Sequence, residues 1–88
     1  MRIKRDPSFK KAFKNRIKNN PKLVKKTIER IAIFVNDPKS PIIKDHQLTG
    51  DRRQHRAFWI TGDIRIIYFP VSKNEVIFVD IGTHNQVY

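Results

Sequence analysis

The chain has 88 residues, a formal net charge of +11 and no cysteine, and a chain of this length forms one small domain with a thin core. The lack of cysteine excludes a disulfide scaffold, a thiol nucleophile and a cysteine metal site. No apolar run approaches the roughly 20 residues that span a bilayer, and the basic N-terminus lacks the apolar core of a secretion signal. We therefore expect a cytoplasmic protein with no membrane partner.

The positive charge is concentrated in the first third of the chain. Residues 1–30 hold twelve Lys and Arg against two acids, a net of +10, whereas residues 31–88 hold seven against six, a net of +1. Such an excess in so small a chain indicates a polyanionic partner. The alternatives are a Lys-rich face that only aids solubility and a basic helix on a membrane surface. We expect the basic part to dock on nucleic acid and the nearly neutral part to hold any specific chemistry.

Two helices are predicted in the basic part. Each begins with an N-cap residue followed by proline at the first helical position, as in Asp6-Pro7 and Asn20-Pro21. Apolar residues recur at helical spacing after each signal, and prolines follow the second series. Residues 7–19 and 21–36 are therefore expected to form a helical hairpin, preceded by a short edge strand.

The rest of the chain has the period of strands. Residues 55–60, 63–69 and 75–81 are rich in isoleucine, valine and aromatic residues, and turn-forming sequences separate them. The short connections predict an antiparallel meander. In the third strand, strict alternation would place on one face Val76, Phe78 and Asp80, and on the other Ile77, Val79 and Ile81.

Two helices followed by three to four strands predict an α+β fold. The basic helical hairpin is expected to pack on one face of a twisted, mainly antiparallel sheet. The opposite face of the sheet is then expected to be free, and a concave sheet face suits single-stranded RNA. Residues 1–88 form a single domain of this kind.

Reactive polar residues of the second part fall at the ends of the predicted strands: His46, Asp63, Arg65, His84 and Tyr88. RNA can be cleaved without a metal ion when its own 2′-OH attacks the neighbouring phosphate, which requires a base, an acid and a cation. Histidine can be the base or the acid near neutral pH, arginine can stabilise the phosphate, and an aromatic ring can hold the RNA. The sequence therefore supplies each group that this reaction needs.

These residues also have ordinary structural interpretations. His46 and His84, taken singly, are typical of surface histidines, and Asp63 is suited to capping a turn. Trp59 is more typical of a core than of a stacking platform. A zinc site is disfavoured because the histidines show neither HxxxH nor HxH spacing.

Three segments occur in order, namely KDHQLTG from Lys44, RAFWITGDIRIIY from Arg56 and IGTHNQVY from Ile81. They resemble the RelE/ParE superfamily of toxins, and its YafQ-like branch most closely. GDIRIIY is similar to the family's central strand, whose consensus is close to D-x-R-x-x-Y. A histidine followed four residues later by an aromatic residue is similar to the family's C-terminal active-site tail. The pair of basic helices fits the same fold, so the resemblance extends over essentially the whole chain.

The resemblance implies the toxin of a type II toxin–antitoxin system, which enters the ribosome and cleaves messenger RNA with no metal ion and no cofactor. It implies catalytic roles for His46, Asp63 and His84, with Tyr88 in place of the terminal aromatic residue. Arg65 stands where RelE-like members have a phosphate-binding arginine. Trp59 departs from the pattern, because YafQ-like relatives have another histidine there. The implied partners are a cognate antitoxin, the ribosome and messenger RNA.

We expect binding to RNA and the ribosome to involve basic residues of both helices and two from the second part: Lys10, Lys11, Lys14, Lys18, Lys22, Lys25, Lys44 and Arg56. Two other functions remain open. A ParE-like inhibitor of DNA gyrase shares the fold but carries out no chemistry, and has no need of two histidines. A non-catalytic RNA- or ribosome-binding module would explain the charge alone.

Overall fold

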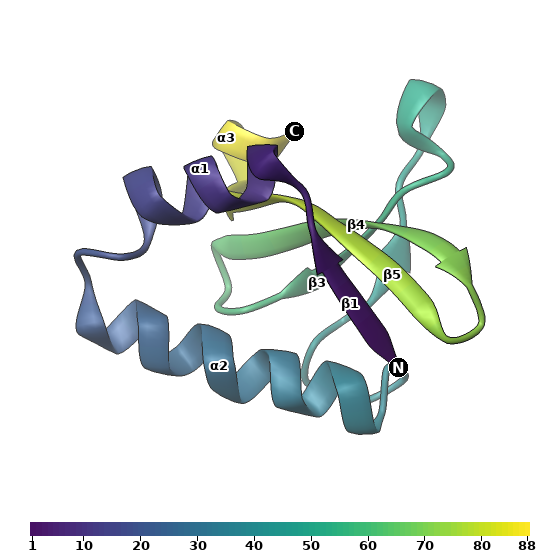
Figure 1. The fold of residues 1–88 in the computed structure, drawn as a ribbon, viewed down its shortest axis with the longest axis horizontal. Helices are drawn as coiled ribbons and strands as arrows, with labels where there is room; N and C mark the ends of the chain where they lie inside the picture. Colours follow the sequence, from purple (N-terminus) through teal and green to yellow (C-terminus); the bar gives the residue numbers. More distant parts are fainter.

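Five strands form one sheet in the order β1–β5–β4–β3–β2 (Figure 1). The computed structural model describes all residues 1–88. The bounds are β1 Arg2–Arg5, β2 His46–Gln47, β3 Arg56–Trp59, β4 Ile64–Ser72 and β5 Glu75–Thr83. β1 runs parallel to β5, and all other neighbours are antiparallel. The α+β class and the meander of β3, β4 and β5 are confirmed. The prediction of three to four strands was too low, because β2 has only two residues and is too short to show a strand period.

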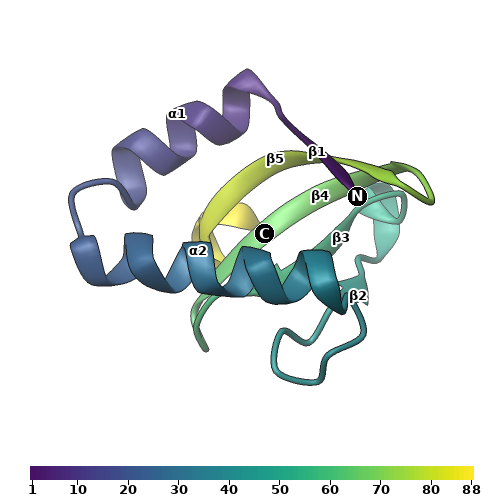
Figure 2. The ribbon, with the colours of Figure 1, turned by 60° about the horizontal axis from the view of Figure 1, so that its bottom comes forward.

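Two helices cover one face of this sheet and spread apart from each other (Figure 2). The bounds of α1 are Pro7–Arg16, and those of α2 are Pro21–Asn36, as predicted. The Asp6 carboxylate accepts the N–H of Ser8 at 2.9 Å, which caps α1. α1 ends before the predicted residue 19, because the N–H groups of Ile17 and Lys18 both donate to the Phe13 carbonyl and close the helix. Neither helix has the length and hydropathy needed to cross a membrane.

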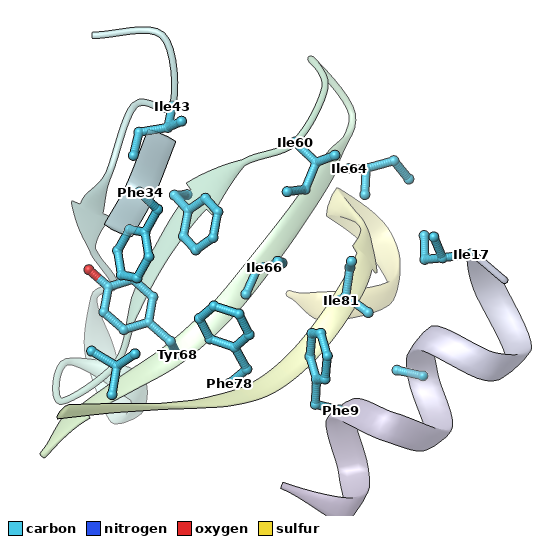
Figure 3. Packing of buried hydrophobic residues seen from close by; sticks show 13 residues of the cluster. Phe9, Ile17, Phe34, Ile43, Ile60, Ile64, Ile66, Tyr68, Phe78 and Ile81 are labelled. Atoms are coloured by element: carbon cyan, nitrogen blue, oxygen red, sulfur yellow. The ribbon is translucent and has the colours of Figure 1, made fainter. Parts of the chain in front are cut away.

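The main core lies between these helices and the sheet and contains 13 buried residues. Phe34 of α2 stacks on Phe58 of β3, with ring centres 4.4 Å apart, and meets the edge of Tyr68 at 4.9 Å. Phe9 of α1 packs on Phe78 of β5 at 5.4 Å. Figure 3 shows these rings gathered over the strands, with isoleucines filling the space beside them. Aromatic contacts therefore fix both helices to the sheet.

A β-bulge in β5 changes which residues face the helices. Ile67 of β4 pairs with Asp80, but Tyr68 pairs with Phe78, so Val79 is an extra residue. Ile81 consequently joins the main core, whereas Asp80 does not. The prediction of strict alternation to Ile81 was wrong beyond this point, because a bulge shifts every later side chain to the other face.

The opposite face of the sheet is partly covered, contrary to the expectation that it is free. The short helix α3, His84–Val87, and the 3-10 turn η1, Gly50–Arg52, lie there. A second cluster of buried residues joins them to the sheet and consists of Leu48, Ala57, Ile67 and Val87, with Val79 packed against it. This small cluster determines where the polar residues around it lie.

Candidate active site

An open cavity of about 390 Å³ lies on the α3 face of the sheet. Three segments form it: β2 with the turn after it, η1, and the C-terminal helix α3. The lining residues are His46, Gln47, Leu48, Thr49, Arg52, His84 and Tyr88. The fold therefore brings together the two predicted histidines and the predicted terminal aromatic residue.

The His46 ring is held in one orientation by its own backbone and by Tyr88. His46 lies opposite Ala57 in the β2–β3 pair, and its Nδ1 is 2.8 Å from the Lys44 carbonyl oxygen. A carbonyl can only accept, so Nδ1 carries the hydrogen in the neutral ring. Nε2 is then an acceptor, and the Tyr88 hydroxyl lies 3.4 Å from it. The lone pair on His46 Nε2 therefore points toward Tyr88, and both residues line the cavity.

Asp45 anchors the segment that carries His46. Both Asp45 carboxylate oxygens accept from the Tyr68 hydroxyl, at 2.9 and 2.8 Å, and one accepts from Arg56 Nε at 3.2 Å. The Asp45 side chain is only 10% exposed. Burial and the Asp45 carboxylate both raise the pKa of Tyr68, which keeps its hydroxyl protonated as a donor. Charge-assisted bonds therefore fix the backbone next to His46.

α3 positions the other two residues of the cavity. The Thr83 hydroxyl accepts the N–H of Gln86, and the Gln86 side chain accepts the N–H of Thr83, which makes a capping box. The rings of His84 and Tyr88 meet edge to face, with centres 4.6 Å apart. The box requires a close approach at Gly82, where an added Cβ would lie 2.6 Å from the Gln86 side-chain oxygen. The sequence thus places His84 and Tyr88 on one helical turn with a fixed start.

Two arginines bring positive charge near Tyr88: Arg52 lines the cavity, whereas the predicted Arg65 does not line it and lies beside the Tyr88 ring. Arg52 donates from Nη1 to the carbonyl of Val87, which joins η1 to α3. Arg65 of β4 donates from Nη1 to the Asp63 carbonyl at 3.1 Å, and its guanidinium carbon lies 5.9 Å from the Tyr88 ring centre. Neither forms an ion pair. Burial raises the pKa of Tyr88, although the charges of Arg65 and Arg52 act against this, so the phenol is protonated at neutral pH.

The Asp63 carboxylate is not part of this cavity. Its side chain is exposed, does not line the cavity and makes no hydrogen bond. Its carbonyl oxygen instead accepts from Arg65 and from the N–H of His84, both at 3.1 Å. The turn is stabilised by the Thr61 hydroxyl, which accepts the N–H groups of Asp63 and Ile64. A role in catalysis for the Asp63 side chain stays a prediction.

Arg52 was missed by the sequence reasoning. It lies in a polar turn beside Arg53, and nothing in the local pattern distinguishes which of the two reaches the cavity. In the structure, Arg52 is half-buried and Arg53 is exposed. What distinguishes Arg52 from Arg53 is its hydrogen bond to the Val87 carbonyl, which forms only when η1 packs against α3.

The residues predicted to bind RNA occupy three settings. The six helix lysines are exposed on α1, α2 and their connection: Lys10, Lys11, Lys14, Lys18, Lys22 and Lys25. Lys44 lies near the cavity, with Nζ 5.3 Å from the Trp59 ring centre. Arg56 is paired with Asp45. Contact of these residues with RNA stays a prediction. No three His, Cys, Asp or Glu side chains lie close enough together to hold a metal ion.

Two splayed helices on a five-stranded sheet, with a His/Tyr cavity at the C-terminal helix, define a protein of the RelE/ParE toxin superfamily. The family model described as "Bacterial toxin of type II toxin-antitoxin system, YafQ" matches residues 1–88. The chain therefore belongs to the YafQ family of type II toxins, and the resemblance found in the sequence is confirmed.

Solved structures agree with this assignment. YafQ from Escherichia coli strain BL21(DE3) superposes with a TM-score of 0.82 at 22% identity, covering 100% of this chain and 99% of that one. The E. coli DinJ–YafQ complex gives a TM-score of 0.80 at 22% identity over 100% and 99%. A metal-bound toxin from Helicobacter pylori gives 0.72 at 26% identity, also over 100% and 99%. A search of curated protein sequences found no significant match.

Proposed function

We propose that this toxin is an endoribonuclease that cleaves messenger RNA on the ribosome without a metal ion. One observation carries the proposal: His46 and His84, far apart in the sequence, both contact Tyr88 at one open cavity. Two groups able to exchange protons near neutral pH, placed beside unpaired arginines, are what cleavage by the 2′-OH requires. Neither a gyrase inhibitor nor a passive RNA-binding module needs this arrangement.

The hydrogen bonds of His46 support the role of base for this residue. Because Nδ1–H is tied to the Lys44 carbonyl, Nε2 is free to take a proton. The Tyr88 hydroxyl lies 3.4 Å from Nε2, and in the proposed complex the ribose 2′-OH replaces it as the partner of Nε2. His46 removes the 2′-OH proton, the 2′-oxygen forms a bond to phosphorus, and the bond from phosphorus to the 5′-oxygen breaks. His84 supplies the proton to the departing 5′-oxygen, which leaves a 2′,3′-cyclic phosphate.

Arginine stabilises the phosphate during this reaction. The five-coordinate phosphorus formed by the attack carries more negative charge than the substrate phosphate, so a fixed cation lowers the barrier. Arg52 lines the cavity, Arg65 lies outside its lining but 5.9 Å from the Tyr88 ring centre, and neither has a carboxylate partner. Tyr88 positions the RNA, and Asp63 aligns Arg65 and His84 through its carbonyl oxygen.

The decisive assay is cleavage of messenger RNA on programmed ribosomes. Wild type should cut and leave 2′,3′-cyclic phosphate ends, and His46→Ala and His84→Ala should each be slower by about 10²–10⁴-fold with unchanged thermal melts. The reaction should survive EDTA once the magnesium requirement of the ribosome is controlled for. Folded histidine variants that cut at the wild-type rate would refute the mechanism. A wild type that never cuts but inhibits gyrase would favour the ParE-like function instead.

The basic helices are proposed to dock on ribosomal RNA. Their six exposed lysines belong to the part of the chain with a net charge of +10. Each lost phosphate contact should reduce the slope of log affinity against log salt by about 0.7–0.9. Reversal of Lys10, Lys14 and Lys18 to Glu should therefore weaken ribosome binding and flatten its salt dependence. Reversal of Lys39 and Lys73, outside the helices, is the control. Equal effects from both sets would refute helix docking.

We also propose that an antitoxin segment binds between α1 and α2. E. coli YafQ forms a complex with DinJ, and the space between the two helices of this chain is a groove of about 250 Å³. Its apolar lining is Phe9, Phe13, Ile28, Ile31 and Phe78, with basic residues at the rim that include Arg5 and Lys10. Ile28 is 63% exposed. An acidic amphipathic segment complements both the lining and the rim.

Coexpression tests this partner. The antitoxin should rescue growth that the toxin alone arrests, and Ile28→Glu should weaken the complex. Val35→Glu is the matched control, because Val35 is an exposed apolar residue of α2 that does not line the groove. Equal loss of binding from both variants, or from neither, would rule out this groove.

A further inference from the structure

Trp59 lies close to two cationic side chains, those of Arg65 and Lys44. It ends β3 and stands directly opposite Arg65 of β4 in the register of the sheet. The guanidinium carbon of Arg65 is 4.7 Å from the Trp59 ring centre, and Nζ of Lys44 is 5.3 Å from it. Arg65 also lies 5.9 Å from the Tyr88 ring. Arg65 is thus flanked by two aromatic rings.

An aromatic ring holds a cation in a different way from a carboxylate. The negative face of the ring attracts the cation but does not cancel its charge. The β3–β4 pair shows both situations, because Arg56 of β3 is paired with Asp45 at 3.2 Å, whereas Arg65 of β4, beside Trp59 of β3, has no acidic partner. The only hydrogen bond of the Arg65 side chain is to the neutral Asp63 carbonyl. Arg65 therefore has a fixed place and an undiminished charge.

Lys44 adds a second cation on the same ring. Its backbone has φ of 48°, in the left-handed region that a lysine rarely adopts, and this turn leads directly into Asp45 and His46. The indole lies within cation–π distance of both Lys44 and Arg65. It therefore attracts two like charges that would otherwise repel each other. This links the position of Arg65 to the segment that carries His46.

We propose that Trp59 is a positioning residue that holds Arg65, and with it Lys44, in place to meet the phosphate of the RNA. Trp59 does not contact the reacting atoms and acts through Arg65. The inference rests on the proposed nuclease activity for its kinetic consequence. The cation–π contacts of the indole with Arg65 and Lys44 are the observations that support this role.

A double-mutant cycle tests this role. Trp59→Leu removes the aromatic face and should slow cleavage by about 2- to 30-fold, mainly in kcat, and Trp59→Phe should recover most of the rate. In an Arg65→Ala background, Trp59→Leu should cost almost nothing more, because the group through which it acts is already gone. Thermal melts of all variants serve as the fold control. Additive losses, or an unchanged rate in Trp59→Leu, would overturn the proposal.

A spectroscopic measurement separates this inference from the proposed function. Trp59 is the only tryptophan of the chain, so its fluorescence reports on this position alone. RNA with a 2′-O-methyl group at the cleavage position cannot be cut, and when it is added without ribosomes it should change the emission of wild type but not of Arg65→Ala. If wild type never cuts, the nuclease proposal fails, and this response still decides whether Trp59 and Arg65 act together. The same emission change in both proteins would refute the coupling.

Discussion

The two faces of the sheet are built in different ways. On one face, the 10-residue α1 and the 16-residue α2 take part with the sheet in a core of 13 buried residues. On the other, the four-residue α3 takes part in a cluster of four. Hydrophobic burial is the main source of stability, so the helix face holds the fold together. The α3 face has a smaller core, which fixes the position of the cavity and leaves the polar side chains around it unburied by hydrophobic packing.

A single strand serves both faces. In β4, Ile64 and Ile66 belong to the main core, whereas Arg65 and Ile67 belong to the α3 face. Successive side chains of a strand point to opposite sides. Adjacent substitutions should therefore separate stability from activity, and this can be tested in order of decreasing effect.

The largest expected effect is on the helix face. Phe34 is 1% exposed and stacks on Phe58 at 4.4 Å. Phe34→Ala should lower the free energy of unfolding by about 3–5 kcal/mol, measured by urea titration, while the molecules that stay folded keep the wild-type rate. Phe34→Leu, which refills most of the volume, is the milder control. A stable Phe34→Ala protein would mean that the helix face does not dominate stability.

Arg65→Ala should give the opposite result on the other face. Loss of one fixed donor to the phosphate should slow cleavage by about 10²–10³-fold, with a melting temperature close to that of wild type. Ile66→Ala, the next residue on the same strand, should cost about 2–5 kcal/mol of stability and leave the rate of the folded protein unchanged. The contrast between the faces breaks down if the two variants behave alike.

Gly82→Ala should have an intermediate effect on both properties. The added methyl would meet the Gln86 side chain at 2.6 Å and Arg16 Nη1 at 2.9 Å. Loss of the capping box should cost about 1 kcal/mol, and displacement of α3 should reduce the cleavage rate by about 10-fold. Gly62→Ala is the matched control, since nothing lies within 4 Å of a Cβ there. A Gly82→Ala enzyme of wild-type rate would show that α3 does not position the site.

The smallest expected effect concerns His55 and the stability of the fold at acidic pH. Burial lowers the pKa of His55 from its ordinary value of 6.5, and the charge of Arg52 adds to this. The unfolded chain then binds the proton more readily than the folded one, so the free energy of unfolding should fall as the pH drops below about 6.5. His55→Gln should reduce this pH dependence in urea titrations between pH 7.5 and 5. An identical pH dependence in the variant would exclude His55 as its source.

Local signals in the sequence predicted the local structure. Asn20-Pro21 and the proline after Asp37 gave both ends of α2, because caps and prolines act within one helical turn. The same kind of signal was available for α3, where Thr83 and Gln86 have capping-box spacing, but four residues are too few to show a helical period. The short edge strand before α1 was predicted and is β1, but features that depend on pairing, such as the bulge at Val79 and the parallel register of β1 with β5, have no local signature.

The sequence predicted those residues of the candidate site that lie at or just beyond the ends of strands. Of the five residues predicted at strand ends, His46, His84 and Tyr88 line one cavity, whereas Asp63 and Arg65 do not line it. Arg52 could not be distinguished from its neighbour, since its place depends on the contact between η1 and α3. Trp59 was noted only as a departure from a family pattern, and its relation to Arg65 became visible through the β3–β4 register.

The position of β5 in the sheet affects how the toxin is made. β5 follows every other strand in the chain but lies between β1 and β4, so that Arg2 is paired across from Glu75. During synthesis, β1 and α1 have no partner strand until residues 75–83 have emerged, and His84 and Tyr88 come later still. Long-range pairing of this kind delays folding. A nascent chain therefore completes neither its main core nor its cavity before β5 and α3 have been made.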